Sequence, residues 1–72
     1  MIIIYKTPTC AYCQMVAKYL DHVGVPYRFE KAEGEFYTTL ATEYGMTVPL
    51  VYNDVTKAAM IGYNIGKLKA MI

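Results

Sequence analysis

The chain has 72 residues, enough for one small domain but below the size at which an apolar core alone gives ample stability. Because 56% of the residues are hydrophobic and only 18% are charged, we expect a dense core and exclude a disordered chain. The formal net charge is +1 and no basic run stands out, which argues against a nucleic acid as partner.

No segment of the sequence is typical of export or of insertion into a membrane. The apolar start, residues 1–5, is too short for a signal-peptide core and lacks a basic lead and a cleavage site. No stretch approaches the roughly 20 apolar residues that span a bilayer. We therefore expect a cytoplasmic protein without a membrane partner, in a compartment whose reducing systems disfavour a permanent disulfide.

The first third of the chain predicts a buried strand followed by a helix. Residues 2–5 form a continuous, mostly β-branched run that is typical of a central strand buried on both faces. Residues 11–23 carry apolar side chains at helical spacing, and Gly24 is expected to end this helix in a left-handed conformation. The expected apolar face of the helix consists of Tyr12, Met15, Val16, Tyr19, Leu20 and Val23.

Five further elements follow in the sequence pattern. They are a strand over 25–30, a helix over 35–44, strands over 49–52 and 57–61, and a short helix over 65–72. Pro26 places the second strand at a sheet edge, Gly45 ends the second helix, and Asn64 is a candidate N-cap of the last helix.

The predicted order is β-α-β-α-β-β-α, with no internal repeat or linker, so we expect residues 1–72 to form a single domain. Strand, helix and strand in succession imply a right-handed parallel crossover. The turn signal Asn53-Asp54 between the third and fourth strands implies an antiparallel hairpin. The sequence therefore predicts an α/β fold in which three helices flank a four-stranded mixed sheet.

Two cysteines, Cys10 and Cys13, stand at the predicted start of the first helix. Two intervening residues place them about one helical turn apart, close enough for a disulfide. Free N–H groups and the helix dipole favour a thiolate at Cys10, and Lys6 adds a positive charge on the preceding strand. We expect Cys13 to be less exposed and suited to resolving a mixed disulfide formed at Cys10.

Two other roles for the cysteines remain open at this point. A zinc site needs four ligands, whereas the chain offers two cysteines and His22. Because His22 lies nearly three helical turns from Cys10, on the polar face, zinc would require two chains; otherwise His22 is a solvated surface residue. Two inert buried cysteines are the other alternative. The spacing favours dithiol redox chemistry over both, with no metal.

Two motifs together resemble the glutaredoxin branch of the thioredoxin fold. Cys10-Ala11-Tyr12-Cys13 follows a strand, and Thr47-Val48-Pro49 precedes the third strand. The resemblance covers essentially the whole chain and implies a thioredoxin-like fold in which Pro49 follows a cis peptide bond. It also implies that Thr47, Val48 and Pro49 dock the substrate through strand-like hydrogen bonds. Without the resemblance, Pro49 is an ordinary proline at the start of a strand.

The resemblance also assigns roles to two residues near the cysteines. Tyr12 matches the aromatic residue that helps to shape the substrate groove; the alternative is a core ring on the apolar face of its helix. Lys6 matches the basic residue that meets a carboxylate of glutathione, and otherwise it is a solvent-exposed side chain.

A third motif, Gly62-Tyr63-Asn64, differs from the typical glutaredoxin pattern. Typical members have two glycines and, shortly after, an aspartate that helps to hold the amino group of glutathione. Here one glycine precedes an aromatic residue, and Asn64 replaces the acid. This form is similar to the NrdH-type redoxins, small electron donors for ribonucleotide reductase that are recharged by thioredoxin reductase. The resemblance leaves all three residues as candidate contacts for glutathione or substrate.

The resemblance as a whole implies a monomeric thiol–disulfide oxidoreductase that carries electrons in cell redox homeostasis. Cys10 and Cys13 would reduce protein disulfides, including that of ribonucleotide reductase. Glutathione, as a co-substrate and not a bound cofactor, or thioredoxin reductase would supply the electrons. A different function, found in some glutaredoxins, is an iron–sulfur carrier in which the first cysteine and glutathione bridge a cluster between two monomers.

Overall fold

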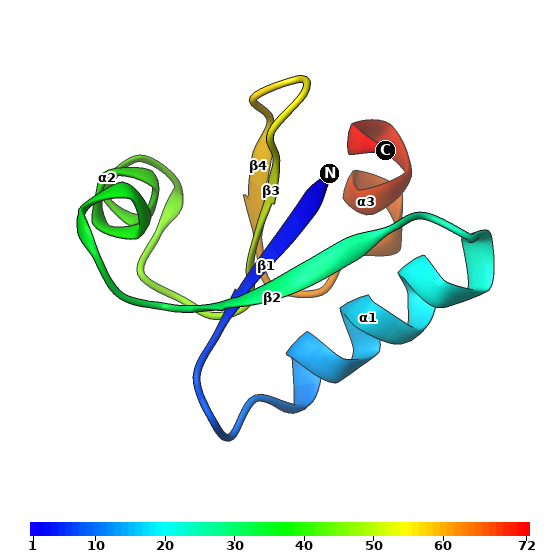
Figure 1. The fold of residues 1–72 in the computed structure, drawn as a ribbon, viewed down its shortest axis with the longest axis horizontal. Coiled ribbons are helices and arrows are strands. Elements are labelled where there is room, and N and C mark those ends of the chain that lie inside the picture. The colour runs from blue at the N-terminus through cyan, green and yellow to red at the C-terminus, as the bar shows by residue number, and fades with distance from the viewer.

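A computed structural model describes residues 1–72 and contains four strands and three helices (Figure 1). In chain order they are β1 (Ile2–Lys6), α1 (Ala11–Val23), β2 (Tyr27–Lys31), α2 (Glu35–Tyr44), β3 (Leu50–Asn53), β4 (Ala59–Ile61) and α3 (Ile65–Met71). This is the predicted order of elements. None of the three helices combines the length and the apolar character needed to cross a membrane.

The four strands form one mixed sheet in the order β2-β1-β3-β4. β1 pairs in parallel with β2, which places Ile4 opposite Phe29. β1 and β3 are antiparallel, as are β3 and β4. The parallel crossover, the antiparallel hairpin and the position of β2 at a sheet edge are therefore confirmed, and the architecture is a thioredoxin-like fold.

The helices cover both faces of the sheet (Figure 1). Along β1, Ile2 and Ile4 join a core cluster that includes side chains of α1 and α3, whereas Ile3 and Tyr5 join a second cluster with side chains of α2. This alternation follows from the two-residue period of a strand. Burial on both faces explains why the sequence of β1 is an unbroken apolar run. Burial, aided by the negative charge of Glu30, raises the pKa of the Tyr5 phenol.

The buried face of α1 differs from the predicted one. The helix buries Cys13, Val16, Ala17 and Leu20. Val16 and Leu20 belong to the predicted apolar face, but Tyr12, Met15 and Val23 of that face are exposed. The buried arc lies about a quarter turn away from the centre of the predicted face, and the small residues Cys13 and Ala17 allow α1 to approach the sheet closely.

The helix ends follow the predicted capping residues. Gly24 has φ 74° and its N–H donates to carbonyls of the last turn of α1, so it is the left-handed cap that the sequence predicts. The side-chain oxygen of Asn64 accepts a hydrogen bond of 3.0 Å from the N–H of Lys67 and caps α3. The end of α1 and the start of α3 are therefore both set by a local capping residue.

The strand bounds differ by one to two residues from the prediction. β2 begins at Tyr27, after Pro26, and β3 begins at Leu50, after Pro49, because a proline cannot donate a ladder hydrogen bond. β4 begins only at Ala59, because Lys57 has φ 64° and belongs to the turn.

Asn53 was expected only as part of a turn but is a buried polar residue of β3. Its amide nitrogen donates to the carbonyl of Met71 at 2.7 Å. Its amide oxygen accepts from the N–H groups of Val55 and Thr56 at 3.0 and 3.3 Å. One side chain therefore fixes the β3–β4 turn and holds the C-terminal end of α3 against the sheet.

Candidate redox site

Cys10 is the N-cap of α1. Its backbone is extended, with φ −134° and ψ 98°, and its Sγ accepts a hydrogen bond of 3.2 Å from the N–H of Cys13. The exposed segment Thr7–Thr9 leads from β1 to this position. The sulfur therefore lies at the positive end of the helix dipole, where an anion is stabilised, as the sequence predicts.

Cys10 and Cys13 form a disulfide, with their Cα atoms 5.3 Å apart. The two residues differ in exposure: Cys10 is half-buried, whereas Cys13 is fully buried in the core cluster. An incoming thiol or disulfide therefore reaches Cys10 first. Cys13 is expected to act only from inside the molecule.

The segment before β3 contains a cis peptide bond between Val48 and Pro49, which confirms the expectation from the resemblance. Pro49 is buried and Val48 is half-buried. The carbonyl of Pro49 accepts a hydrogen bond of 2.8 Å from the N–H of Gly62. Gly62 has φ 78°, a left-handed conformation that favours glycine, so the single glycine of this motif has a structural reason.

Three separate parts of the chain meet at one core cluster next to the disulfide. Cys13 belongs to this cluster, and Cys10, Val48 and Tyr63 pack against it. The fold therefore brings together the cysteine pair, the cis-proline segment and the segment between β4 and α3. These are the three motifs that the sequence singled out.

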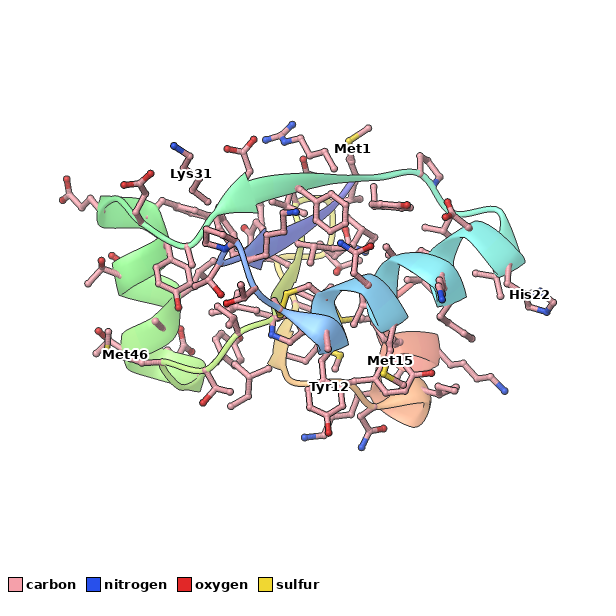
Figure 2. The ribbon with its side chains drawn as sticks, turned by 90° about the horizontal axis from the view of Figure 1, so that it is seen from below. Met1, Tyr12, Met15, His22, Lys31 and Met46 are labelled. Atoms are coloured by element: carbon pink, nitrogen blue, oxygen red, sulfur yellow. A yellow bond between two sulfur atoms is a disulfide. The ribbon has the colours of Figure 1, made fainter.

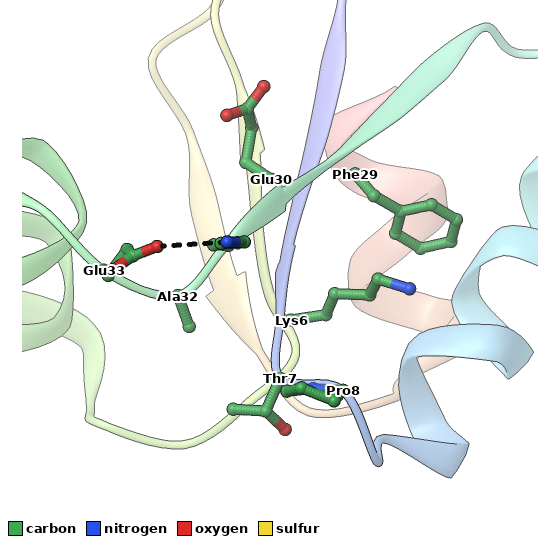
Figure 3. Close-up of a pocket in the computed structure, with 8 residues that line it drawn as sticks. Lys6, Thr7, Pro8, Phe29, Glu30, Ala32 and Glu33 are labelled. Atoms are coloured by element: carbon green, nitrogen blue, oxygen red, sulfur yellow. Dashed lines mark ion pairs between the residues drawn. The ribbon is translucent and has the colours of Figure 1, made fainter.

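Lys6 lies at the end of β1, half-buried, with its side chain turned toward β2 (Figure 3). Its Nζ is 4.4 Å from the centre of the Phe29 ring, a cation–π contact. It lines a cavity of 490 Å³ together with Thr7, Pro8 and residues of β2 and the loop after it. Glu30 and Glu33 line the same cavity, but neither pairs with Lys6, so the ammonium group of Lys6 has no carboxylate partner.

Two other predicted contact residues are exposed. Tyr12 has 58% of its surface exposed and Thr47 is exposed as well. The alternative role of Tyr12 as a core ring is therefore wrong. Neither side chain makes a hydrogen bond within the protein, which leaves both hydroxyl groups available to a ligand.

Asn64 is exposed, and its side-chain oxygen is already used as the cap of α3. A Cβ atom at Gly66 would lie 3.3 Å from that oxygen, so the glycine leaves room for the cap. The side chain carries no negative charge. The position where typical glutaredoxins have an acid thus serves helix capping in this chain.

His22 lies at the far end of α1 from the cysteines (Figure 2). It lines a surface groove together with Met15, Lys18, Tyr19 and Tyr63. Met15 and Tyr19 belong to the predicted apolar face of α1, whereas the groove between this helix and Tyr63 was not predicted. No three His, Cys, Asp or Glu side chains come together so that they could hold a metal ion.

Comparison with known proteins identifies the family. The glutaredoxin family model matches residues 2–56, which is most of the chain. The structure is similar to the glutaredoxin (grx-1) from Archaeoglobus fulgidus, with a TM-score of 0.73 and 26% identity over 97% of this chain and 83% of that chain. It also shares the fold of the thioredoxin-like protein BC3987, with a TM-score of 0.72 and 24% identity over the full length of both chains. No curated protein sequence matched.

The matched segment contains both cysteines and the Thr47-Val48-Pro49 motif. A disulfide between residues of unequal exposure at a helix N-terminus is able to accept and return two electrons. The chain therefore belongs to the glutaredoxin family, and its Cys10–Cys13 pair makes it a thiol–disulfide oxidoreductase.

Proposed function

We propose that the protein is a dithiol electron donor that reduces disulfides in other proteins. The observation that carries this proposal is the disulfide between the accessible Cys10 and the fully buried Cys13. The Cys10 thiolate attacks one sulfur of the substrate disulfide and releases the other as a thiol. Cys13 then attacks the Cys10 sulfur and releases the second substrate thiol, so that two electrons pass to the substrate.

Thr47, Val48 and Pro49 are proposed to dock the substrate beside Cys10. Val48 is half-buried, lies just before β3 and packs against the same core cluster as Cys10, which supports this role. A substrate segment in extended conformation would exchange backbone hydrogen bonds with Val48. Ribonucleotide reductase is proposed as one such substrate because of the family resemblance.

Replacing Cys13 with serine is expected to stop the reaction at the mixed disulfide. The substitution leaves the Cys10 sulfur and the helix start in place, since the N–H that bonds Cys10 belongs to the backbone of residue 13. The serine oxygen cannot resolve the mixed disulfide. Intact-mass spectrometry, after mixing the reduced variant with an oxidised peptide, should show one peptide adduct on each chain. Complete reduction of the peptide by Cys13→Ser would contradict the assignment of Cys13.

Two reductants are supported by different residues. Lys6 has no carboxylate partner, which supports a contact with a glutathione carboxylate. Asn64 carries no charge and caps α3 with its oxygen, which weakens any contact with the glutathione amino group and favours thioredoxin reductase. In either case the proposed cycle needs no bound cofactor and suits the cytoplasm, where both systems supply electrons.

The reductant is tested by supplying NADPH with either glutathione and its reductase or with thioredoxin reductase. Asn64→Asp is the informative variant, because aspartate caps a helix as well as asparagine does but adds the missing charge. We expect this change to raise the glutathione-coupled rate about two- to fivefold, the range for an exposed ion pair.

The rate with thioredoxin reductase should be unchanged by Asn64→Asp and serves as the control. An unchanged glutathione-coupled rate would show that Asn64 does not face the glutathione amino group. If thioredoxin reductase alone reduces the parent protein, the proposed contact of Lys6 with glutathione is wrong.

A further inference from the structure

An exposed groove runs along α1 on the side where this helix meets Tyr63. It has a volume of 380 Å³ and is lined by Met15, Lys18, Tyr19, His22 and Tyr63. We refer to these five residues as the α1–Tyr63 groove. It includes neither cysteine nor any residue of the cis-proline segment and shares only Tyr63 with the redox site, so most of the groove lies outside that site.

The groove is nevertheless connected to the redox site at one end. Met15 lies two residues after Cys13 on α1, and Tyr63 follows Gly62, whose N–H is bonded to the carbonyl of Pro49. In Figure 2, Tyr12 and Met15 lie beside each other on α1, with His22 farther along the helix. From Tyr12 to His22 the helix rises about 15 Å, the length of four to five residues of an extended chain.

Two apolar side chains along this line, Tyr12 and Met15, lie outside the core, whereas Tyr19 is half-buried and packs against it. Tyr12, Met15 and Tyr19 are spaced at three and four and so share one helix face, adjacent to the buried one. Tyr12 and Met15 are 58% and 41% exposed. Apolar side chains that are contiguous on a surface and lead to a reactive group are typical of a binding surface.

Apart from the tyrosines, the ionisable side chains that line the groove are both basic. They are Lys18 and His22, and no carboxylate lines it. The one acid of α1, Asp21, accepts a hydrogen bond of 3.1 Å from the hydroxyl of Tyr27, on β2. The groove is thus an apolar floor with a positive border, which is complementary to apolar and acidic side chains.

We infer that the α1–Tyr63 groove binds an acidic, partly apolar segment of the protein whose disulfide is reduced at Cys10. The segment lies four to five residues to one side of the substrate cysteines, a length that matches the span of α1 from Tyr12 to His22. This inference rests on the proposed function. It adds a determinant of substrate choice that acts through Lys18 and Met15 and not through the redox site.

The test uses two synthetic peptides that each contain one intramolecular disulfide and a six-residue tail. The tail alternates glutamate and leucine in one peptide and lysine and leucine in the other, and each tail is placed on either side of the cysteines. Protein that has been reduced beforehand is mixed with each peptide for a single turnover, so no recharging system is needed. We expect the acidic peptide to react about tenfold faster at low salt, with a smaller difference at high salt.

Three single variants locate the effect. Lys18→Glu should reverse the preference in favour of the basic peptide. Lys57→Glu is the matched control, because it makes the same change of charge at an exposed side chain of the β3–β4 turn, which lies away from α1 (Figure 1) and lines neither the groove nor the Lys6 cavity. Met15→Gln, which keeps the shape but adds polarity, should slow both peptides about threefold.

Reduction of hydroxyethyl disulfide, a small uncharged substrate, separates this inference from the proposed function. All three variants should reduce it at the rate of the parent protein. Equal rates for the two peptides, or equal effects of Lys18→Glu and Lys57→Glu, would overturn the inference and leave the proposed function intact. A dimer that Met15→Gln abolishes, without a preference between peptides, would assign the groove to a second copy and also overturn it.

Discussion

Replacing Cys10 with serine is expected to abolish disulfide reduction. Cys10 is the accessible sulfur of the pair, whereas Cys13 is fully buried and cannot replace it as the attacking group. A serine hydroxyl does not form the mixed disulfide through which the reaction passes. The single-turnover rate with hydroxyethyl disulfide should therefore fall to that of buffer alone.

The fold of Cys10→Ser should be preserved, which makes the loss of activity interpretable. Serine is among the best N-cap residues, and its oxygen can accept the N–H of Cys13 as the sulfur does. Circular dichroism and urea unfolding should give values close to those of the reduced parent protein. A rate comparable to that of the parent would show that Cys10 is not the attacking residue.

Local signals in the sequence were sufficient to place the helices. The bounds of α1 and α2 agree with the predicted 11–23 and 35–44, because glycine follows each helix and the apolar spacing is continuous between its ends. Asn64 was predicted as a cap for the same local reason. The strands were less well placed at their ends, since pairing with a neighbour decides where a strand stops.

Which face of α1 is buried could not be predicted from the periodicity of apolar residues. Tyr12 and Met15 fit the helical period as well as Val16 and Leu20 do, but only the second pair contacts the sheet. The apolar period shows that the helix has an apolar face. It does not show how α1 is rotated about its own axis against the sheet, which depends on how the helix packs beside α3. Apolar residues that stay exposed and apolar residues of the core therefore look alike in the sequence.

The pattern of apolar and turn residues in the sequence also did not predict contacts between residues that are distant along the chain. The cis bond at Pro49 was expected from the family resemblance and from nothing in the composition or spacing. The contact of Lys6 with the Phe29 ring depends on the pairing of β1 with β2. Met71, which accepts a hydrogen bond from Asn53, lies 18 residues farther along the chain.

Replacing Asn53 with alanine is expected to lower the free energy of unfolding by about 2–4 kcal/mol, because it removes three hydrogen bonds and leaves the carbonyl of Met71 without its buried partner. The carbonyl of Met71 and the N–H groups of Val55 and Thr56 lose their partner. Urea unfolding of the reduced protein measures the change. Asn64→Ala is the matched control, since an exposed cap with one hydrogen bond contributes only about 1 kcal/mol.

Asn53→Asp distinguishes the two halves of this network. A carboxylate still accepts from the N–H groups of Val55 and Thr56, but it faces the carbonyl of Met71 without a proton to donate. The folded state therefore favours the protonated acid, which raises the pKa of the new carboxyl above that of the unfolded chain. Its contribution to stability is present below the unfolded pKa of about 3.9 and is lost as pH rises through the folded pKa.

The stability of Asn53→Asp relative to the parent should thus improve as the pH is lowered from neutral toward 4, whereas that of Asn53→Ala should stay constant. If both variants lose the same stability at every pH, the hydrogen bond from Asn53 to Met71 contributes nothing measurable. A difference that follows this pH dependence would show that α3 is held to the sheet through this bond. Tyr63 and Asn64, at one border of the redox site, directly precede α3, and Met71 lies at the other end of this helix. The bond from Asn53 to Met71 would then also help to hold that border in position.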